Sequence, residues 1–330
     1  MKKKKITDKF GREITYLRLA VIDRCNLRCF YCMPEEGIQF VKKDELLSYE
    51  EMERLVRLLA NLGVNKLRLT GGEPFIRRDF IAFLSRLSSI DGLDKISITT
   101  NGLLTARYID DLKRLGITNI NLSMDTLRPD VFKKITRRDE FNKVWNTLHR
   151  LVEEDFNVKI NAVVMEGVNE GEINDLTGLT RDMPVSMRFI EEMPFNGSGS
   201  RNEKLKWSYS EILKEISSAY TLHRLDDTSD STSMNYRIEG HQGTVGVIPA
   251  WSRTFCGGCN RIRITAQGEF KTCLYDHGKF SIKALMRQGM TDEKLTDTLV
   301  NMISNKYKDG FEAEDAREES ISESMSTIGG

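Results

Sequence analysis

Three of the six cysteines of the chain lie within eight positions, in the segment CNLRCFYC at residues 25–32. Cys25, Cys29 and Cys32 have the spacing C-x3-C-x2-C, which lets a loop bring three thiolates around a soft metal centre. Structural zinc normally takes four ligands, and no histidine or fourth cysteine lies near this group in the sequence. Three ligands leave one coordination position open, as a reactive centre requires.

The other three cysteines form a second group. Cys256 and Cys259 are spaced C-x2-C, and Cys273 follows beyond the predicted strand RIRIT. A zinc ribbon would need another C-x2-C, so this group also leaves a ligand position open. Arg261 and Arg263 lie between these cysteines and share one face of a predicted strand. This pattern favours a substrate platform over a structural zinc knot.

The composition argues against disulfides and against a general nucleic-acid binder. The 330 residues include 49 Lys and Arg and 49 Asp and Glu, so any basic site must be local. No apolar run is long enough to span a bilayer, and the basic start MKKKKITDKF lacks a following apolar segment. We therefore expect a cytoplasmic protein without membrane contact, where disulfides are rare.

The elements that must position these residues alternate between strands and helices. The predicted strands are 15–22, NKLRLT from 65, ISITT from 96, INLSMD from 120, VKINAVVM from 158 and VSMRFIE from 185. Helices are predicted from Ser48 to Gly63, near 78–89, near 105–115, over one long stretch at about 129–154, and near 170–181. This order predicts an α/β fold with a parallel sheet, as a partial (βα)6 TIM-like barrel; a doubly wound sheet is the alternative.

The alternation weakens after about residue 194. A helix near 208–219 precedes four short runs, YRIEG, TVGVIP, RIRIT and EFKTCLY, which are typical of antiparallel hairpins. We therefore expect residues 1–220 to form the barrel and residues 221–330 a smaller C-terminal module of antiparallel strands.

The strands have an apolar face and a polar, often cationic, face. Leu17 and Leu19 oppose Arg18, and Leu67 and Leu69 oppose Arg68. The polar face also carries Lys66 and Lys159. Buried cations without partners are costly, so a barrel interior with these residues implies a polyanionic ligand such as a phosphate ester. An antiparallel sheet with one wet face is the alternative, which the intervening helices disfavour.

Two motifs together resemble the radical S-adenosylmethionine superfamily. They are the C-x3-C-x2-C segment with Tyr31 before its last cysteine, and TGGEP at residues 70–74. The resemblance implies that Cys25, Cys29 and Cys32 hold a 4Fe–4S cluster whose open iron binds the methionine part of S-adenosylmethionine. Reductive cleavage of that molecule would give a 5′-deoxyadenosyl radical.

The sequence also resembles the GTP 3′,8-cyclase family of molybdenum cofactor biosynthesis over nearly its whole length. The matching segments are LRLAVIDRCNLRCFYCMP, KLRLTGGEPFIRRD, ITTNG, NLSMDTL, VVMEGVN, RFIEEMPF, CGGCNRIRITAQGEFKTCLY and the terminal Gly-Gly. Ile22 stands where the family usually has Thr, and residues 222–240 match weakly.

This second resemblance implies a complete set of site residues. Cys256, Cys259 and Cys273 would hold a second 4Fe–4S cluster that binds the guanine of GTP. The implied GTP contacts are Arg18, Lys66, Arg68, Thr99, Lys159, Arg188, Arg261 and Arg263. The implied contacts to S-adenosylmethionine are Tyr31, Gly72, Ser123 and Met193. Arg261 and Arg263, with Gly329 and Gly330 of a tail that enters the active site, are the expected catalytic residues.

The expected reaction converts GTP to (8S)-3′,8-cyclo-7,8-dihydroguanosine 5′-triphosphate. The expected partners are GTP, an external electron donor and the next enzyme of the pathway, cyclic pyranopterin monophosphate synthase, with a homodimer possible. Two other interpretations stay open on the residues. One is a peptide-modifying radical S-adenosylmethionine enzyme with an auxiliary cluster, and the other is a zinc-stabilised protein that binds RNA or another anion.

Overall fold

The strands of the chain form one continuous sheet. The computed structural model describes residues 5–196, 205–228, 231–278, 280–319 and 321–329. Within these residues, a sheet of twelve strands has the order β12-β11-β10-β1-β2-β3-β4-β5-β6-β9-β8-β7. The strands are β1 (Tyr16–Ala20), β2 (Lys66–Thr70), β3 (Lys95–Thr100), β4 (Asn119–Ser123), β5 (Asn157–Val164), β6 (Ser186–Glu191), β7 (Leu222–Arg224), β8 (Met234–Ile238), β9 (Thr244–Ile248), β10 (Arg261–Ile264), β11 (Glu269–Lys271) and β12 (Phe280–Ser281).

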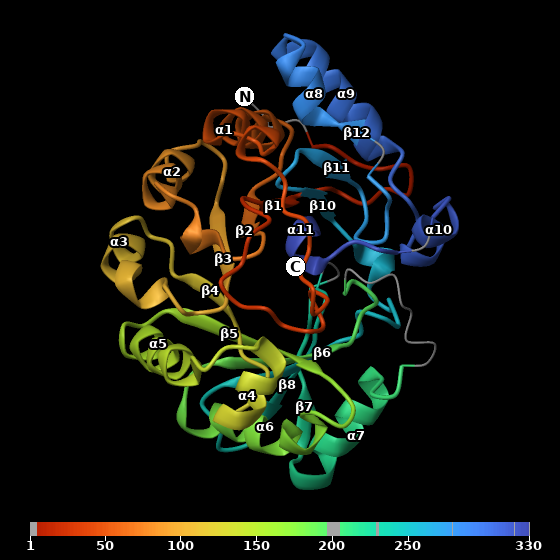
Figure 1. The fold of residues 1–330 in the computed structure, drawn as a ribbon. Coiled ribbons are helices and arrows are strands. Elements are labelled where there is room, and N and C mark those ends of the chain that lie inside the picture. Colours follow the sequence, from red (N-terminus) through yellow and green to blue (C-terminus); the bar gives the residue numbers. More distant parts are fainter. Residues whose placement is uncertain (1–4, 197–204, 229–230, 279, 320, 330) are drawn as a thin grey trace.

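Helices follow the strands and cover the outside of the sheet (Figure 1). The α-helices are α1 (Tyr49–Asn61), α2 (Phe80–Ser88), α3 (Ile109–Arg114), α4 (Pro129–Thr136), α5 (Phe141–Glu153), α6 (Ile173–Asp182), α7 (Tyr209–Ala219), α8 (Ile282–Arg287), α9 (Asp292–Ser304), α10 (Gly310–Asp315) and α11 (Met325–Ile328). Short 3-10 helices are η1 (Lys43–Glu45), η2 (Pro74–Ile76), η3 (Thr105–Tyr108), η4 (Glu170–Glu172) and η5 (Cys256–Gly258). The helix predicted from Ser48 begins with a capping box, in which Glu51 N donates to Ser48 Oγ and Ser48 N donates to Glu51.

The sheet curves into an open barrel, as predicted. Strands β1 to β6 are parallel and follow one another in sequence order. Leu17, Leu19 and Leu69 are fully buried on the side that faces the helices. The register places Arg18 beside Arg68 of β2 and Arg263 of β10, on the opposite face of the sheet. Alternation along each strand therefore sends the leucines into the core and the arginines into the barrel interior.

The C-terminal strands are antiparallel among themselves, as expected, but they also extend the barrel sheet at both edges. Strand β9 pairs in parallel with β6, and β7 and β8 complete a meander beyond it. Strand β10 pairs in parallel with β1, and β11 and β12 follow antiparallel to it. These strands cover both edges of the six-stranded parallel sheet. Helix α11 lies inside the ring of strands (Figure 1).

The long helix predicted at about 129–154 is wrong, because it is two helices. Helix α4 ends at Thr136, and Arg137 caps it with a left-handed backbone at φ 55°. The apolar positions of the two helices keep a helical spacing, which hid this break from the sequence. The carboxyl end of α4 instead binds the cysteine loop through two backbone hydrogen bonds. Ile135 O accepts from Phe30 N, and Thr136 O accepts from Arg28 N.

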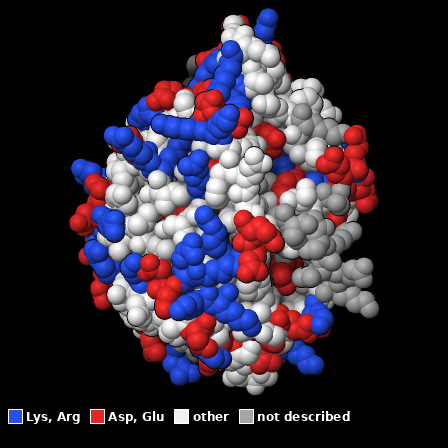
Figure 2. All heavy atoms as spheres, in the orientation of Figure 1, with Lys and Arg blue, Asp and Glu red and all other residues white. Residues whose placement is uncertain are grey.

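The outer surface carries charges of both signs. Figure 2 shows Lys and Arg side chains interspersed with Asp and Glu over the visible face. Within the described part of the chain, no helix has the length and apolar character to cross a membrane.

The Arg137 side chain supports a first prediction, about the stability of the apo-protein. Its Nη1 donates to the carbonyl oxygens of Arg28, Met33 and Pro34, at 3.1, 3.2 and 3.4 Å. We expect Arg137→Ala to lower the free energy of unfolding by about 2 kcal/mol, because a charged donor is lost from partly buried carbonyls. Arg137→Gly should cost less, since glycine accepts the left-handed backbone.

Urea denaturation of the apo-protein measures both changes. Arg138→Ala is the control, because Arg138 is exposed and its Nη1 donates to the carbonyl oxygen of Arg137. Equal stability of the wild type and Arg137→Ala would contradict the prediction.

Candidate active site: a cavity between two cysteine groups

The N-terminal cysteine group lies at the carboxyl end of β1. Cys25, Cys29 and Cys32 line one cavity together with residues that follow β2, β3, β4 and β6. The Cys25 Sγ accepts hydrogen bonds from Leu27 N at 3.4 Å and from Asn101 Nδ2 at 3.5 Å. Burial, and then the charge of Glu73, raises the pKa of Cys25 to about 11. These thiols lie in a protected pocket, at the end of the barrel where parallel sheets place their ligands.

The residues predicted to contact S-adenosylmethionine come together in this cavity. Tyr31, Gly72, Ser123 and Met193 all line it. The Tyr31 hydroxyl donates to Asp125 Oδ2 at 2.9 Å, and Asp125 Oδ1 accepts from Val163 N. Burial raises the pKa of Asp125 to about 6, although these two hydrogen bonds oppose the shift. Asp125 was not among the predicted site residues, although it ends the predicted strand INLSMD and shares a face with Ser123.

The Gly-Gly-Glu part of the second motif fastens the cysteine loop to the sheet. Gly72 N donates to Ile22 O, and Glu73 N donates to Arg24 O, both at 2.8 Å. A Cβ on Gly72 would lie 2.1 Å from Arg24 O, so only glycine permits this approach. The buried Glu73 carboxylate accepts from Thr100 Oγ1, Asn101 N and Phe75 N. Burial raises the pKa of Glu73 to about 7, although these three hydrogen bonds act to lower it.

The C-terminal cysteine group lies at the other end of the strands. Cys256 and Cys259 precede the amino end of β10, which is parallel to β1. Cys273 follows β11, which returns antiparallel to the same end. Strand β1 has five residues, so the two groups are separated along the barrel by roughly 17 Å of strand. All three cysteines line a second cavity with Arg261 and Arg263.

Positive charge surrounds this second group. Burial of the Cys259 thiol would raise its pKa, but the charges of Lys306 and Arg261 outweigh this and lower it to about 6. Lys306 is buried and donates from Nζ to Arg261 O at 3.0 Å and to Thr272 O. Lys306 was missed because it follows a helix more than thirty positions beyond Cys273, with no motif around it.

The second cavity is cationic. Arg18, Arg68, Thr99, Arg188, Arg261 and Arg263 line it. The Nε atoms of Arg18, Arg68 and Arg188 are buried and have no hydrogen-bond partner among the described residues. Such guanidiniums fit the oxygens of a polyanion.

Two of the predicted GTP contacts lie elsewhere. Lys66 and Lys159 are not among the residues that line either cavity. Lys159 lies two positions before Asn161 on β5 and so shares its face, toward the amino ends of the strands. Burial, followed by the charge of Arg188, lowers the pKa of Lys159 to about 7.

The two cavities share part of their walls. Thr99, Asn161, Ile190, Met193 and Met325 line both. The sequence predicted only Thr99 and Met193 of these. Asn161 was visible as a polar residue on the inner face of a strand, whereas Met325 belongs to the tail and carried no signal.

The C-terminal tail reaches this shared region. Gly329 O accepts a hydrogen bond from Arg263 Nη1 at 2.6 Å, and a Cβ on Gly329 would lie 2.9 Å from the Thr70 side chain. Gly329 is thus placed beside a predicted catalytic arginine. Gly330, which was also predicted, lies outside the described residues.

The donor atoms suit iron–sulfur clusters. Among the described residues, no group of three His, Cys, Asp or Glu side chains is arranged to hold a metal ion. Cysteines that bind different irons of one cluster lie farther apart than the ligands of one ion. Two sets of three cysteines, each beside a cavity, fit clusters with an open iron.

Comparison with known proteins identifies the family. Residues 19–179 match the Radical SAM superfamily, and residues 185–311 match Molybdenum Cofactor Synthesis C. The chain is 37% identical over 326 residues to "GTP 3′,8-cyclase" of Desulforamulus reducens, covering 98% of this chain and 99% of that one. The chain belongs to the GTP 3′,8-cyclase family. It is therefore a radical S-adenosylmethionine enzyme.

Other members of the GTP 3′,8-cyclase family differ in length. The chain is 42% identical over 303 residues to "GTP 3′,8-cyclase, mitochondrial" of Arabidopsis thaliana, covering 91% of this chain and 77% of that one. It is 42% identical to "Molybdenum cofactor biosynthesis protein 1" of Homo sapiens, with 92% of this chain covered, but it spans only 48% of that protein.

Solved structures share the fold at low sequence identity. The structure of Streptococcus suis SuiB aligns with a TM-score of 0.61 at 14% identity, covering 94% of this chain and 70% of that one. SuiB bound to S-adenosylmethionine aligns with a TM-score of 0.58, also at 14% identity, covering 82% of this chain and 63% of that one. These similarities confirm the predicted barrel fold.

The close approach at Gly72 gives a second prediction. Gly72→Ala must displace the backbone of Arg24 and Cys25, so we expect the N-terminal cysteine group to lose most of its capacity to hold iron. Iron and sulfide are measured per chain after anaerobic reconstitution. Gly171→Ala is the control, because a Cβ there meets nothing within 4 Å. Wild-type iron content in Gly72→Ala would contradict the argument.

Proposed function

We propose that the protein is a GTP 3′,8-cyclase that converts GTP to (8S)-3′,8-cyclo-7,8-dihydroguanosine 5′-triphosphate, the first step of molybdenum cofactor biosynthesis. One observation carries the proposal: six arginines line the cavity that also contains the second cysteine group, and this cavity shares a wall with the first group. Relatives named for this activity support it.

We assign the N-terminal cavity to one 4Fe–4S cluster and S-adenosylmethionine. Cys25, Cys29 and Cys32 would hold the cluster, and Tyr31, Gly72, Ser123 and Met193 would contact S-adenosylmethionine. When bound, the two would supply a 5′-deoxyadenosyl radical, the species needed for hydrogen abstraction at the ribose of GTP. The protein contributes a pocket walled by the ends of β2, β3, β4 and β6, which orients the reacting groups and excludes water.

We assign the second cavity to GTP and to a second 4Fe–4S cluster, held by Cys256, Cys259 and Cys273. The guanine would lie at these cysteines, and the arginines would bind the triphosphate. Arg18, Arg68 and Arg263 lie side by side on adjacent strands, so their charges repel one another until an anion enters. The ribose would then lie near Thr99 and Asn161, in the wall that both cavities share.

We propose roles for the remaining predicted site residues and partners as well. Lys66 and Lys159 would act on the triphosphate from the next layer of the barrel, and Gly329 and Gly330 would complete the catalytic end of the tail. An external donor must supply the electron that starts the reaction. Handover to cyclic pyranopterin monophosphate synthase, a homodimer, a cytoplasmic location, and a division into residues 1–220 and 221–330 also remain proposals.

Anaerobic turnover tests the function directly. Incubation with GTP, S-adenosylmethionine and dithionite should give 5′-deoxyadenosine and a cyclised GTP product. Reconstituted protein should contain about eight iron and eight sulfide per chain if both cysteine groups hold 4Fe–4S clusters. About two zinc per chain with no sulfide would overturn the proposal.

The paired arginines of β10 give a third prediction. We expect Arg261→Ala with Arg263→Ala to weaken GTP binding at least about 100-fold, since each lost charged hydrogen bond costs about 1.5–3 kcal/mol. Equilibrium binding to the reconstituted protein measures this. Arg57→Ala is the control, because Arg57 lies on the surface of α1 and pairs with Glu53. Unchanged GTP affinity in the double variant would remove the main support for the assignment.

Lys159 gives a fourth prediction, about pH. The pKa of Lys159 in the free protein is about 7, whereas the ordinary value is 10.5. A bound triphosphate would raise this pKa, so GTP binding takes up a proton between these two values. The affinity should therefore be greatest below about pH 7 and fall as the pH rises through the window, by up to about tenfold per unit.

Calorimetry at pH 8 in two buffers of different ionisation enthalpy counts the protons taken up. Wild type should take up close to one proton more than Lys159→Met, and the exposed Lys143→Met should behave as wild type. Identical proton uptake in wild type and Lys159→Met would show that Lys159 does not sense the anion.

A further inference from the structure

The tail segment, residues 321–329, connects the outer surface to the inside of the barrel. Ile321 and Ile328 are buried in a small apolar cluster with Phe195, Tyr275 and Ala313, separate from the main core. Helix α11, which ends at Ile328, lies within the ring of strands (Figure 1). A short segment that enters a cavity must be fixed at its base, because ordering it costs conformational entropy.

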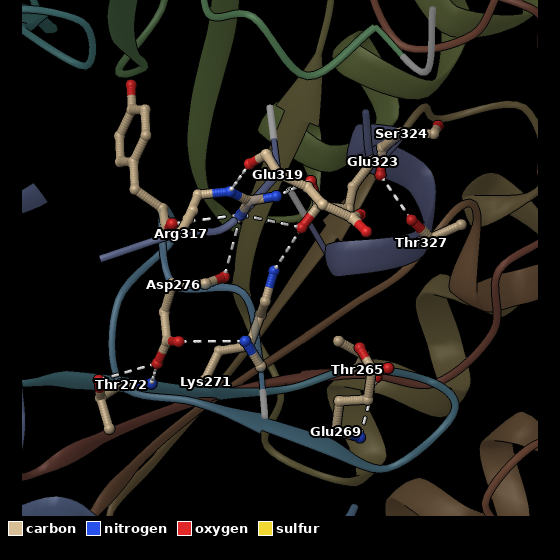
Figure 3. Close-up of polar contacts among 12 residues, drawn as sticks. Thr265, Glu269, Lys271, Thr272, Asp276, Arg317, Glu319, Glu323, Ser324 and Thr327 are labelled. Atoms are coloured by element: carbon tan, nitrogen blue, oxygen red, sulfur yellow. Dashed lines mark hydrogen bonds and ion pairs between the residues drawn. The ribbon is translucent and has the colours of Figure 1, made fainter. Parts of the chain in front are cut away.

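An ionic cluster fixes that base. Glu323 Oε1 accepts from Lys271 Nζ at 3.2 Å, and the Glu323 carboxylate accepts from Arg317 at 2.8 and 3.1 Å (Figure 3). The Lys271 side chain is 0% exposed and that of Arg317 3%, against 22% for Glu323. Burial would raise the pKa of Glu323, but Arg317 and Lys271 lower it to about 2, so the carboxylate is charged at all working pH values.

The same cluster holds the turn that carries Cys273. Lys271 ends β11, two positions before this cysteine. The Arg317 guanidinium donates to Tyr275 O at 3.3 Å and Asp276 O at 3.4 Å, and Thr272 N and Oγ1 both donate to Asp276 Oδ2 at 3.0 Å. Arg317 therefore bridges the base of the tail and the turn at 272–276 (Figure 3).

The next residues of the tail contact the other cysteine group. Ser324 Oγ donates to Cys32 O at 2.5 Å, and Met325 N donates to Phe195 O at 3.0 Å. Met325 then lines both cavities, and Gly329 O reaches Arg263. Within seven residues the tail contacts one cysteine loop, the shared wall and Arg263.

We propose that Glu323 is a positioning residue for catalysis: paired with Lys271 and Arg317, it ties the tail segment to the Cys273 turn and holds Gly329 against Arg263. The consequence for the reaction rests on the proposed function, whereas the anchoring itself does not. If Glu323 is neutralised, the Arg317 guanidinium and the buried Lys271 ammonium lose the charged carboxylate that both pair with, although the charge of Glu269 still acts on Lys271. The tail then leaves the cavity more often, and the turn with Cys273 loosens with it.

Hydrogen–deuterium exchange of the reconstituted holoenzyme tests the anchor. In Glu323→Gln we expect peptides covering 321–329 and 272–276 to exchange at least tenfold faster, while the barrel strands β2 to β5 keep wild-type rates. Glu319→Gln is the matched control: it removes the same charge four positions earlier, from an exposed residue whose contact with Arg317 is through its backbone oxygen. It should exchange as wild type.

Turnover and iron content separate positioning from simple stability. In Glu323→Gln, kcat should fall at least tenfold while iron per chain stays at the wild-type value. If Glu323→Gln does not fold, Arg317→Gln tests the same anchor, because it leaves the Lys271–Glu323 pair in place and removes the bridge to the turn.

Two outcomes would overturn the anchor. One is an exchange rate of the tail peptides in Glu323→Gln that equals the rate in Glu319→Gln. The same comparison applies to Arg317→Gln where that variant is used in its place. The other is an exchange rate that rises by the same factor in peptides of the whole chain, which would mean that Glu323 stabilises the fold in general. Failure of the wild type to convert GTP, with the expected exchange pattern intact, would count against the proposed function and leave the anchor standing.

Discussion

Mutual repulsion of guanidiniums inside the barrel is the constraint on which the rest of the structure depends. Register alone places Arg18 between Arg68 and Arg263 on neighbouring strands. Burial, and then the charge of Arg68, lowers the pKa of Arg18 to about 10. Burial would raise the pKa of Tyr16, but the charges of Arg68, Arg18 and Arg261 lower it. The apolar outer layer of helices must hold these cations together without help from their own electrostatics.

That constraint explains which parts of the site could be predicted from the sequence. Strand alternation is a local property, so the inward direction of Arg18 and Arg68 was visible in pentapeptides. The two cysteine groups were visible because their ligand spacing is local as well. The depth of each cation in the barrel could not be predicted from the sequence, because it depends on the register between strands. Lys66 and Lys159 share the inner face but lie in a layer that neither cavity reaches.

Long-range pairing accounts for the other differences. The strands after residue 220 have hairpin patterns, and the hairpins exist, but nothing local shows that β9 joins β6 and β10 joins β1. The break at Arg137 was hidden because both helices keep one apolar spacing, and its cause lies in the carbonyls of the cysteine loop. Glu323 belongs to an acidic, polar tail, where its pairing with a fully buried lysine has no sequence signature.

The parallel pairing of β1 with β10 also sets the order in which the molecule is built. The hydrogen bond between Asn260 and Thr15 closes a loop of 245 residues. Contacts of such sequence separation form late, since their closure entropy must be met first. On the ribosome, the first cysteine group also emerges long before the tail residues Met325 and Ser326, which line its cavity. Until the tail is in place, this cavity lacks part of its wall and a cluster there would be less protected from solvent and oxygen, so cluster loading is best timed after the whole chain has folded.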